Sequence, residues 1–196
     1  MEPSPSYFIL TAANDLDGCV VDQYPRDMQC IWQPTEGVRV RPLYPSALDF
    51  HMSRRMGGKR VSDVLRNTLG YFIVSERMRH LLEAGSTADI EFLPLQLFNH
   101  KGRRELQTFF IANVLAVFDC MDPRRSEYEP SALKKGELFE LRRLHLDTSR
   151  IDPRRNIFRL ASMPRVIIIR EELAHVLQEA GLTGMDLIPM GSAVTL

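Results

Sequence analysis

The stretch YFIVSERMRHLLEAG, residues 71–85, decides the fold because it passes from one periodicity to another within a few residues. It opens with the apolar run FIV at residues 72–74, which predicts a strand. Ser75 offers a side-chain oxygen to the free amides of a following helix, and Gly85 stands where that helix should stop. A second apolar run, IEFLPL at residues 90–95, comes next. The stretch therefore predicts a strand, a helix and a strand.

The same pattern recurs near the C-terminus at a constant spacing. The run III at residues 167–169 corresponds to FIV, and LIPM at residues 187–190 corresponds to FLPL at residues 92–95 (187 − 92 = 95). The helix start differs, because Arg170 stands where Ser75 stood. The identities are few, and any strand-helix-strand unit produces similar apolar spacing. We predict two similar structural units.

The remaining apolar runs predict a sheet with few helices. The run at residues 109–118 is the most apolar and indicates one central strand that is buried on both faces. The spacing of Val61, Val64, Leu65 and Leu69 predicts a helix over 61–69. Other strands are expected at residues 7–10, 38–41, 138–141 and 157–160. The predicted class is α+β, with a mixed or mostly antiparallel sheet and a few packed helices, in a single domain of residues 1–196. Two halves split near residues 100–135 are the alternative.

The composition indicates a folded cytoplasmic protein. The 196 residues are 44% hydrophobic, and 25 Lys and Arg balance 25 Asp and Glu. Zero net charge argues against a dedicated nucleic-acid binder. The cysteines Cys19, Cys30 and Cys120 form no CxxC pair, which suits reduced thiols. The acidic, proline-rich start lacks the features of a signal peptide, and no apolar run approaches the ~20 residues of a membrane span.

The sequence contains no recognisable reaction centre. Its five histidines show no zinc-binding spacing, and no GxSxG motif is present. The nearest candidates for chemistry are Cys120, at the end of an apolar run, and the pair His145 and Asp147, which would share one face of a strand. We expect no catalytic residue, no metal and no cofactor, and a small enzyme using these groups is an alternative.

Arginine pairs are the most repetitive polar feature of the chain. If they converge, they could bind phosphate or an acidic protein surface. A nucleic-acid-binding module is therefore a further alternative, and solvated loop charges account for the pairs equally well. The pairs lie at residues 54–55, 103–104, 124–125, 142–143 and 154–155.

Over about residues 30 to 190, the order and spacing of several short motifs resemble a known bacterial family. That family was first described as a domain of unknown function and was later grouped with the immunity proteins of polymorphic toxin systems, with a Myxococcus protein as its namesake. The motifs are GYFIVSER (70–77), IEFLPL (90–95), FIANVL (110–115), residues 119–126, IFRL (157–160) and AGLTGMDLIP (180–189).

The resemblance implies a cytoplasmic protein that binds one cognate toxin and neutralises it. It implies no catalytic residue. The candidate contacts are the acidic loop with Asp15, Asp17 and Asp22, together with Trp32 if it is exposed. Acidic groups would suit a toxin whose active site binds nucleic acid.

Overall fold

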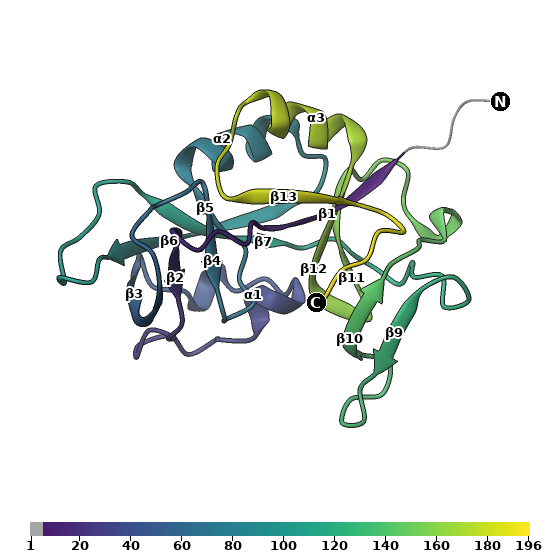
Figure 1. The fold of residues 1–196 in the computed structure, drawn as a ribbon, viewed down its shortest axis with the longest axis horizontal. Coiled ribbons are helices and arrows are strands. Elements are labelled where there is room, and N and C mark those ends of the chain that lie inside the picture. The colour runs from purple at the N-terminus through teal and green to yellow at the C-terminus, as the bar shows by residue number, and fades with distance from the viewer. Residues whose placement is uncertain (1–5) are drawn as a thin grey trace.

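The computed structural model describes residues 6–196 (Figure 1). Its strands form a closed six-stranded barrel, a five-stranded sheet and a two-stranded ribbon. The strands are β1 (Tyr7–Ala12), β2 (Cys19–Val21), β3 (Leu48–Gly57), β4 (Val64–Asn67), β5 (Ile73–Ser75), β6 (Ile90–Phe98), β7 (Phe109–Val114), β8 (Val117–Phe118), β9 (Glu127–Pro130), β10 (Leu138–Arg143), β11 (Ile157–Leu160), β12 (Met163–Arg170) and β13 (Met185–Pro189). The helices of this part are α1 (Gln33–Glu36), α2 (Glu76–Gly85) and α3 (Glu171–Glu179), with 3-10 turns at Arg41–Leu43 and Thr148–Arg150. Mixed sheets with few helices fit the predicted α+β class.

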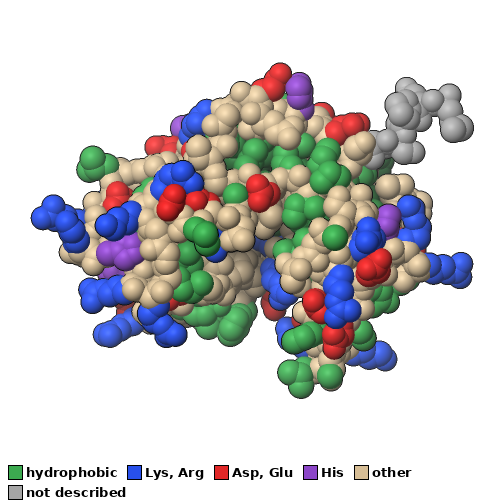
Figure 2. Space-filling view, in the orientation of Figure 1, with side chains coloured by type: hydrophobic (Ala, Val, Ile, Leu, Met, Phe, Trp, Pro, Cys, Tyr) green, Lys and Arg blue, Asp and Glu red, His purple; other side chains and the backbone are tan. Residues whose placement is uncertain are grey.

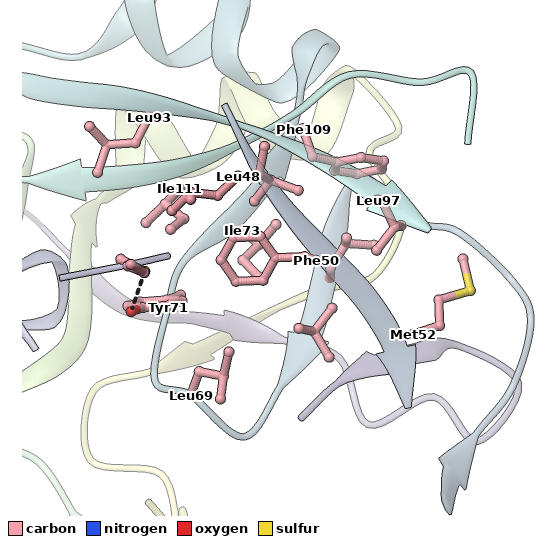
Figure 3. Packing of buried hydrophobic residues seen from close by; sticks show 14 of the residues in the cluster. Leu48, Phe50, Met52, Leu69, Tyr71, Ile73, Leu93, Leu97, Phe109 and Ile111 are labelled. Atoms are coloured by element: carbon pink, nitrogen blue, oxygen red, sulfur yellow. Dashed lines mark hydrogen bonds between the residues drawn. The ribbon is translucent and has the colours of Figure 1, made fainter. Parts of the chain in front are cut away.

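The barrel closes around one apolar interior. Its strand order is β2-β3-β6-β7-β5-β4, and β2 pairs in parallel with β4 to complete the circle. Side chains alternate between the inside and outside of β6, as a pleated strand requires. Figure 3 shows Phe50, Phe109 and Ile111 converging inside the barrel, where each is at most 1% exposed. The Tyr71 hydroxyl donates a 2.6 Å hydrogen bond to the Ile31 carbonyl, so this buried polar group is satisfied.

The five-stranded sheet has the order β13-β1-β12-β11-β8 and is covered on both faces. Ile167 and Ile169 of β12 face a core that they share with α2 and α3. Val166 and Ile168 face a separate core on the opposite side. In Figure 1, α2 and α3 lie together above the sheets. The core under these helices also takes residues from β5 and β7, so it joins the barrel to the sheet.

The structure contains a strand, a helix and a strand at both predicted places. In each unit a third strand lies between the two strands and pairs with both of them. In the first unit, β5-α2-β6, strand β7 lies between β5 and β6 and is antiparallel to both. In the second unit, β12-α3-β13, strand β1 has the same place and direction. The hairpin strands β4 and β11 precede the units, and each pairs antiparallel with the first strand of its unit.

The registers of the two units agree residue by residue. Ser75 pairs with Phe109, and Arg170 pairs with Tyr7, so the unit strands are offset by 95 residues (170 − 75 = 95). The enclosed strands read FFIANV in β7 and YFILTA in β1. β7 follows its unit in the chain, whereas β1 precedes its own unit, so the first described strand completes the last unit. The fold is thus a permuted internal repeat.

Reciprocal hydrogen bonds tie the units to each other. The Asp63 carboxylate, just before β4, accepts 2.9 Å hydrogen bonds from the amide and the hydroxyl of Thr183, in the loop that follows α3. Asn156, just before β11, accepts equivalent bonds of 2.9 and 3.0 Å from the amide and hydroxyl of Thr87, in the loop that follows α2. Each unit therefore anchors the helix-to-strand loop of the other.

Three local predictions were wrong. Residues 61–69 form no helix, because β4 separates two cores: Val64 faces one and Leu65 the other, so consecutive apolar residues imitate a helical face. Residues 38–41 form no strand, because the Val40 and Arg41 amides bond to the buried Glu91 carboxylate at 2.9 and 3.0 Å instead of to a ladder. The run 109–118 breaks after Val114, where the chain leaves the barrel for the five-stranded sheet.

No helix within residues 6–196 has the length and hydrophobicity needed to cross a membrane. The choice between one domain and two halves stays a prediction.

Candidate partner-binding cleft

A cleft separates the barrel from the strands β9 and β10, and Figure 2 shows the indentation on this face. Its main hollow has a volume of about 510 Å³. The barrel side contributes Tyr24, Trp32 and Leu69, and the opposite side contributes Leu138 and Arg165. A second hollow of about 220 Å³ shares Gly70 and Arg165 with the first and continues to Leu196. Residues that are far apart in the sequence thus form one continuous concave surface.

Trp32 projects from a rigid base at the rim of this cleft. Its indole is 58% exposed and packs edge-on against the Tyr24 ring, with the ring centres 5.7 Å apart. Its carbonyl accepts hydrogen bonds of 2.9 and 2.7 Å from the amide and hydroxyl of Thr35. Pro34 stands in the first turn of α1, where a missing amide hydrogen costs nothing. The backbone is therefore fixed, while the large aromatic side chain stays available to a partner.

Arg159 holds α1 in place from inside the molecule. Its guanidinium is completely buried and donates to the carbonyls of Val114 (2.8 Å), Pro164 (2.7 Å) and Pro34 (2.9 Å), with a fourth bond to Thr35. Burial lowers the pKa of Arg159 to about 10, so the group remains charged at neutral pH. These bonds join α1 to β7 and to β12, so the α1 side of the cleft is tied to the strand that carries Arg165.

One lysine closes part of the cleft with ion pairs. Lys134, in the turn between β9 and β10, lies 3.1 Å from the Glu137 carboxylate and 3.8 Å from that of Glu36 in α1. The second pair reaches across the cleft from one wall to the other. All three side chains are well exposed, so the pairs contribute little to stability and can exchange for a partner's charges.

Two of the three acidic residues predicted as contacts, Asp15 and Asp22, have side-chain partners within the chain. Arg60 donates to the Asp15 carboxylate at 3.0 Å, and this hydrogen bond holds the pKa of Asp15 below its usual range. Asp22 accepts a 2.6 Å hydrogen bond from the Ser53 hydroxyl, while the Asp17 side chain is exposed. Asp15, Asp17 and Asp22 lie near the end of β3, whereas Trp32 lines the cleft. Their role in binding stays a prediction.

The groups considered for chemistry are not arranged for it. Cys120 is fully buried, and burial raises the pKa of its thiol to about 12, which keeps it protonated at neutral pH. The Asp147 carboxylate accepts hydrogen bonds from the amide and hydroxyl of Ser149 and starts a 3-10 turn. The His145 ring instead packs near Gly191. Among residues 6–196, no group of three or more His, Cys, Asp or Glu side chains is placed to hold a metal ion.

The five arginine pairs divide into two kinds. Arg142, Arg143, Arg154 and Arg155 form ion pairs with carboxylates on their own or neighbouring segments. The pairs at 54–55, 103–104 and 124–125 are exposed and form no ion pair within the described residues. The first two of these unpaired sets lie on adjacent segments of the barrel.

Sequence reasoning found Trp32 but missed the cleft around it. Tyr24, Gly70 and Arg165 come from three distant segments, and no local pattern predicts that they meet. The buried Arg159 was also missed, because it lies in the short apolar run IFRL and no nearby residue indicates an acceptor. The one available signal was a charged residue within an apolar strand, which must find polar partners when it is buried.

Comparison with known proteins places the chain in a family. No curated protein matches it. Residues 6–192 match the Immunity protein family (Imm11), which covers nearly the whole chain and includes both repeat units and the cleft. The resemblance seen in the short motifs is therefore shown for the chain as a whole, and the protein belongs to the Immunity protein family (Imm11).

Proposed function

We propose that this chain neutralises one cognate bacterial toxin by direct protein contact, and that the toxin seats against the cleft around Trp32. The observation that carries the proposal is the family match over residues 6–192, because an immunity protein protects against a toxin. The cleft provides a surface to which a toxin could bind. It combines an exposed tryptophan, a tyrosine and an arginine, which are the residue types enriched in the energetic centres of protein interfaces.

In the proposed mechanism the chain inhibits the toxin by staying bound to it, and it does not act on the toxin as an enzyme. Hydrogen bonds from Thr35 fix the backbone of Trp32, and its ring already packs against Tyr24 before a partner arrives. Little conformational entropy is therefore lost when the ring is buried. The exposed carboxylates and Lys134 at the mouth form a polar rim around the aromatic centre. A toxin held there would be blocked sterically or locked in an inactive form, and the contact would take place in the cytoplasm of the producing cell.

Co-expression tests this function. The neighbouring open reading frames are first searched for a large gene with a variable C-terminal domain. That domain is the probe, and it is produced in a bacterial host with and without the present chain. We expect the domain to stop growth alone and the chain to restore it. Trp32→Ala should weaken the purified complex by roughly 2 kcal/mol or more, about thirtyfold in Kd, because a central aromatic anchor is lost.

Val176→Ala is the matched control. Val176 is 41% exposed on α3, which lies on the opposite side of the molecule from α1 in Figure 1, so its loss should leave binding unchanged. Failure of the wild-type chain to restore growth, although it is folded and abundant, would contradict the function. Equal binding by the Trp32 and Val176 variants would contradict the assignment of the cleft.

A further inference from the structure

Basic side chains gather at one end of the barrel. Figure 2 shows them at the left of the molecule, over β3 and the loop between β6 and β7. We call this surface the basic end, and its members are Arg54, Arg55, Lys59, Lys101, Arg103 and Arg104. All six residues are exposed, and none of them forms an ion pair within residues 6–196.

The sheet register explains why two distant segments meet there. β3 and β6 are parallel, and their ladder ends where His51 pairs with Phe98. β6 ends at Phe98, whereas β3 continues to Gly57 in pairing with β2. Arg54 and Arg55 therefore lie on the part of β3 beyond this ladder, at the same end of the barrel as the loop that starts at Asn99. This loop turns back through Gly102, and Arg104 then bridges to Phe98. Two of the five arginine pairs therefore converge by topology.

The basic end has an excess of positive charge, although the chain as a whole is neutral: its six cations outnumber the nearby carboxylates that no cation pairs with, which are Asp17, Asp22 and Glu105. The nearby Asp15 carboxylate is occupied by Arg60, and the Glu105 carboxylate accepts a hydrogen bond from Asn99 at 3.0 Å. By contrast, Arg142 and Arg143 at the other end of the molecule have glutamate partners within 3.5 Å. Unpaired like charges repel each other, and an anionic partner removes that repulsion.

The surface between the cleft and the basic end is continuous. Tyr24 lines the cleft and also a neighbouring hollow of about 470 Å³, whose far side includes His51. The His51 ring stacks on Phe98, with ring centres 5.1 Å apart, at the edge of the basic end. One partner seated in the cleft and spreading toward β3 would therefore reach these cations.

We propose that the basic end is the positively charged part of the toxin-binding surface and that it contacts a carboxylate-rich face of the toxin. This inference rests on the proposed function. A protein partner fits better than nucleic acid, because the fully exposed Leu106 and the part-exposed Met56 lie among the cations and the whole chain has no basic excess. Apolar side chains within a charged rim are typical of protein interfaces.

Charge reversal tests the inference with a matched control. Arg103→Glu/Arg104→Glu changes the charge of the basic end by four units, and Arg124→Glu/Arg125→Glu makes the same change at another exposed, unpaired arginine pair. Association of each variant with the neighbouring gene's toxin domain is measured by surface plasmon resonance at several salt concentrations. We expect the first variant to associate at least tenfold more slowly and to lose most of the salt dependence, while the second associates like the wild type.

The outcomes separate this inference from the function on which it rests. No binding by the folded wild-type chain would overturn both. Wild-type binding that the two double variants retain equally, or lose equally, would overturn the inference alone. Retention of the wild type on duplex DNA at low salt, lost only in the Arg103/Arg104 variant while toxin binding persists, would assign the basic end to nucleic acid and also overturn it.

Discussion

Asp63 and Asn156 occupy equivalent positions in the two repeat units, but only Asp63 carries a charge. Both accept hydrogen bonds from the amide and hydroxyl of a threonine in the other unit. Burial on its own would raise the pKa of Asp63. Hydrogen bonds from Ser75 and Thr183, aided by the charge of Arg77, outweigh burial and lower the pKa below the ordinary value of 3.8. The repeat therefore contains one pH-dependent anchor and one pH-independent anchor.

Asp63→Asn should make the two anchors chemically alike. Because the folded-state pKa of Asp63 lies below its unfolded value, ionised Asp63 stabilises the fold above that value, and this contribution is lost as the pH falls through the folded pKa. We expect the variant to be less stable than the wild type at pH 7, by about 1 kcal/mol. The difference should shrink between about pH 5 and pH 3. Urea unfolding across this range measures it, and a constant difference would contradict the assignment.

At the scale of the element, the start of α2 depends on one hydroxyl. The Ser75 side chain accepts a hydrogen bond from the Met78 amide at 3.2 Å and donates one to Asp63 at 2.7 Å, in a fully buried position. Ser75→Ala removes the cap and leaves a buried carboxylate short of a donor. We expect a loss of about 2 kcal/mol of unfolding free energy, measured with urea.

Ser162→Ala is the control for this substitution. Ser162 is nearly as buried, but its hydroxyl has only a 4.0 Å contact with the Met121 sulfur. Its loss should cost less than about 1 kcal/mol. Equal losses in the two variants would mean that burial, and not the cap, sets the cost.

The elements also show what could be predicted from sequence. The Ser75 cap and the stop at Gly85 are local signals, and α2 begins and ends as they predict. The repeat could be seen in the sequence because the two units keep the same spacing of apolar residues although most of the residues themselves differ. Strand β4 was mistaken for a helix because burial on two faces removes the alternation that identifies a strand. The barrel could not be predicted, since closure depends on the parallel pairings β2 with β4 and β3 with β6, which leave no local signature.

At the scale of the whole molecule, β1 makes the chain interdependent. It lies between β12 and β13, so the first described strand completes the last unit, and one core joins that unit to the barrel. We predict a single cooperative thermal transition, with calorimetric and van't Hoff enthalpies that agree. Removing residues 1–12 should abolish it. Two resolved transitions, or a truncated chain that still unfolds cooperatively, would instead support two independent halves.

The proposed binding surface also depends on the whole molecule, because the tertiary structure brings its residues together. Trp32 could be singled out as the only tryptophan, but its exposure and its neighbours follow from tertiary structure. Tyr24 and Arg165 are 141 residues apart in the chain (165 − 24 = 141) and line the same hollow. Likewise, the arginine pairs were visible in the sequence, whereas the register of β3 and β6 decides which of them converge.

The most direct test of the account is a stoichiometric titration of toxin activity. Increasing amounts of the chain are added to a fixed amount of the purified toxin domain, and the remaining activity is measured after short and long incubation. If the chain acts as a binding surface, activity should fall in proportion to the added chain, reach zero near one equivalent and stay the same with time. Progressive loss of activity at a small fraction of one equivalent would show turnover and contradict the central claim.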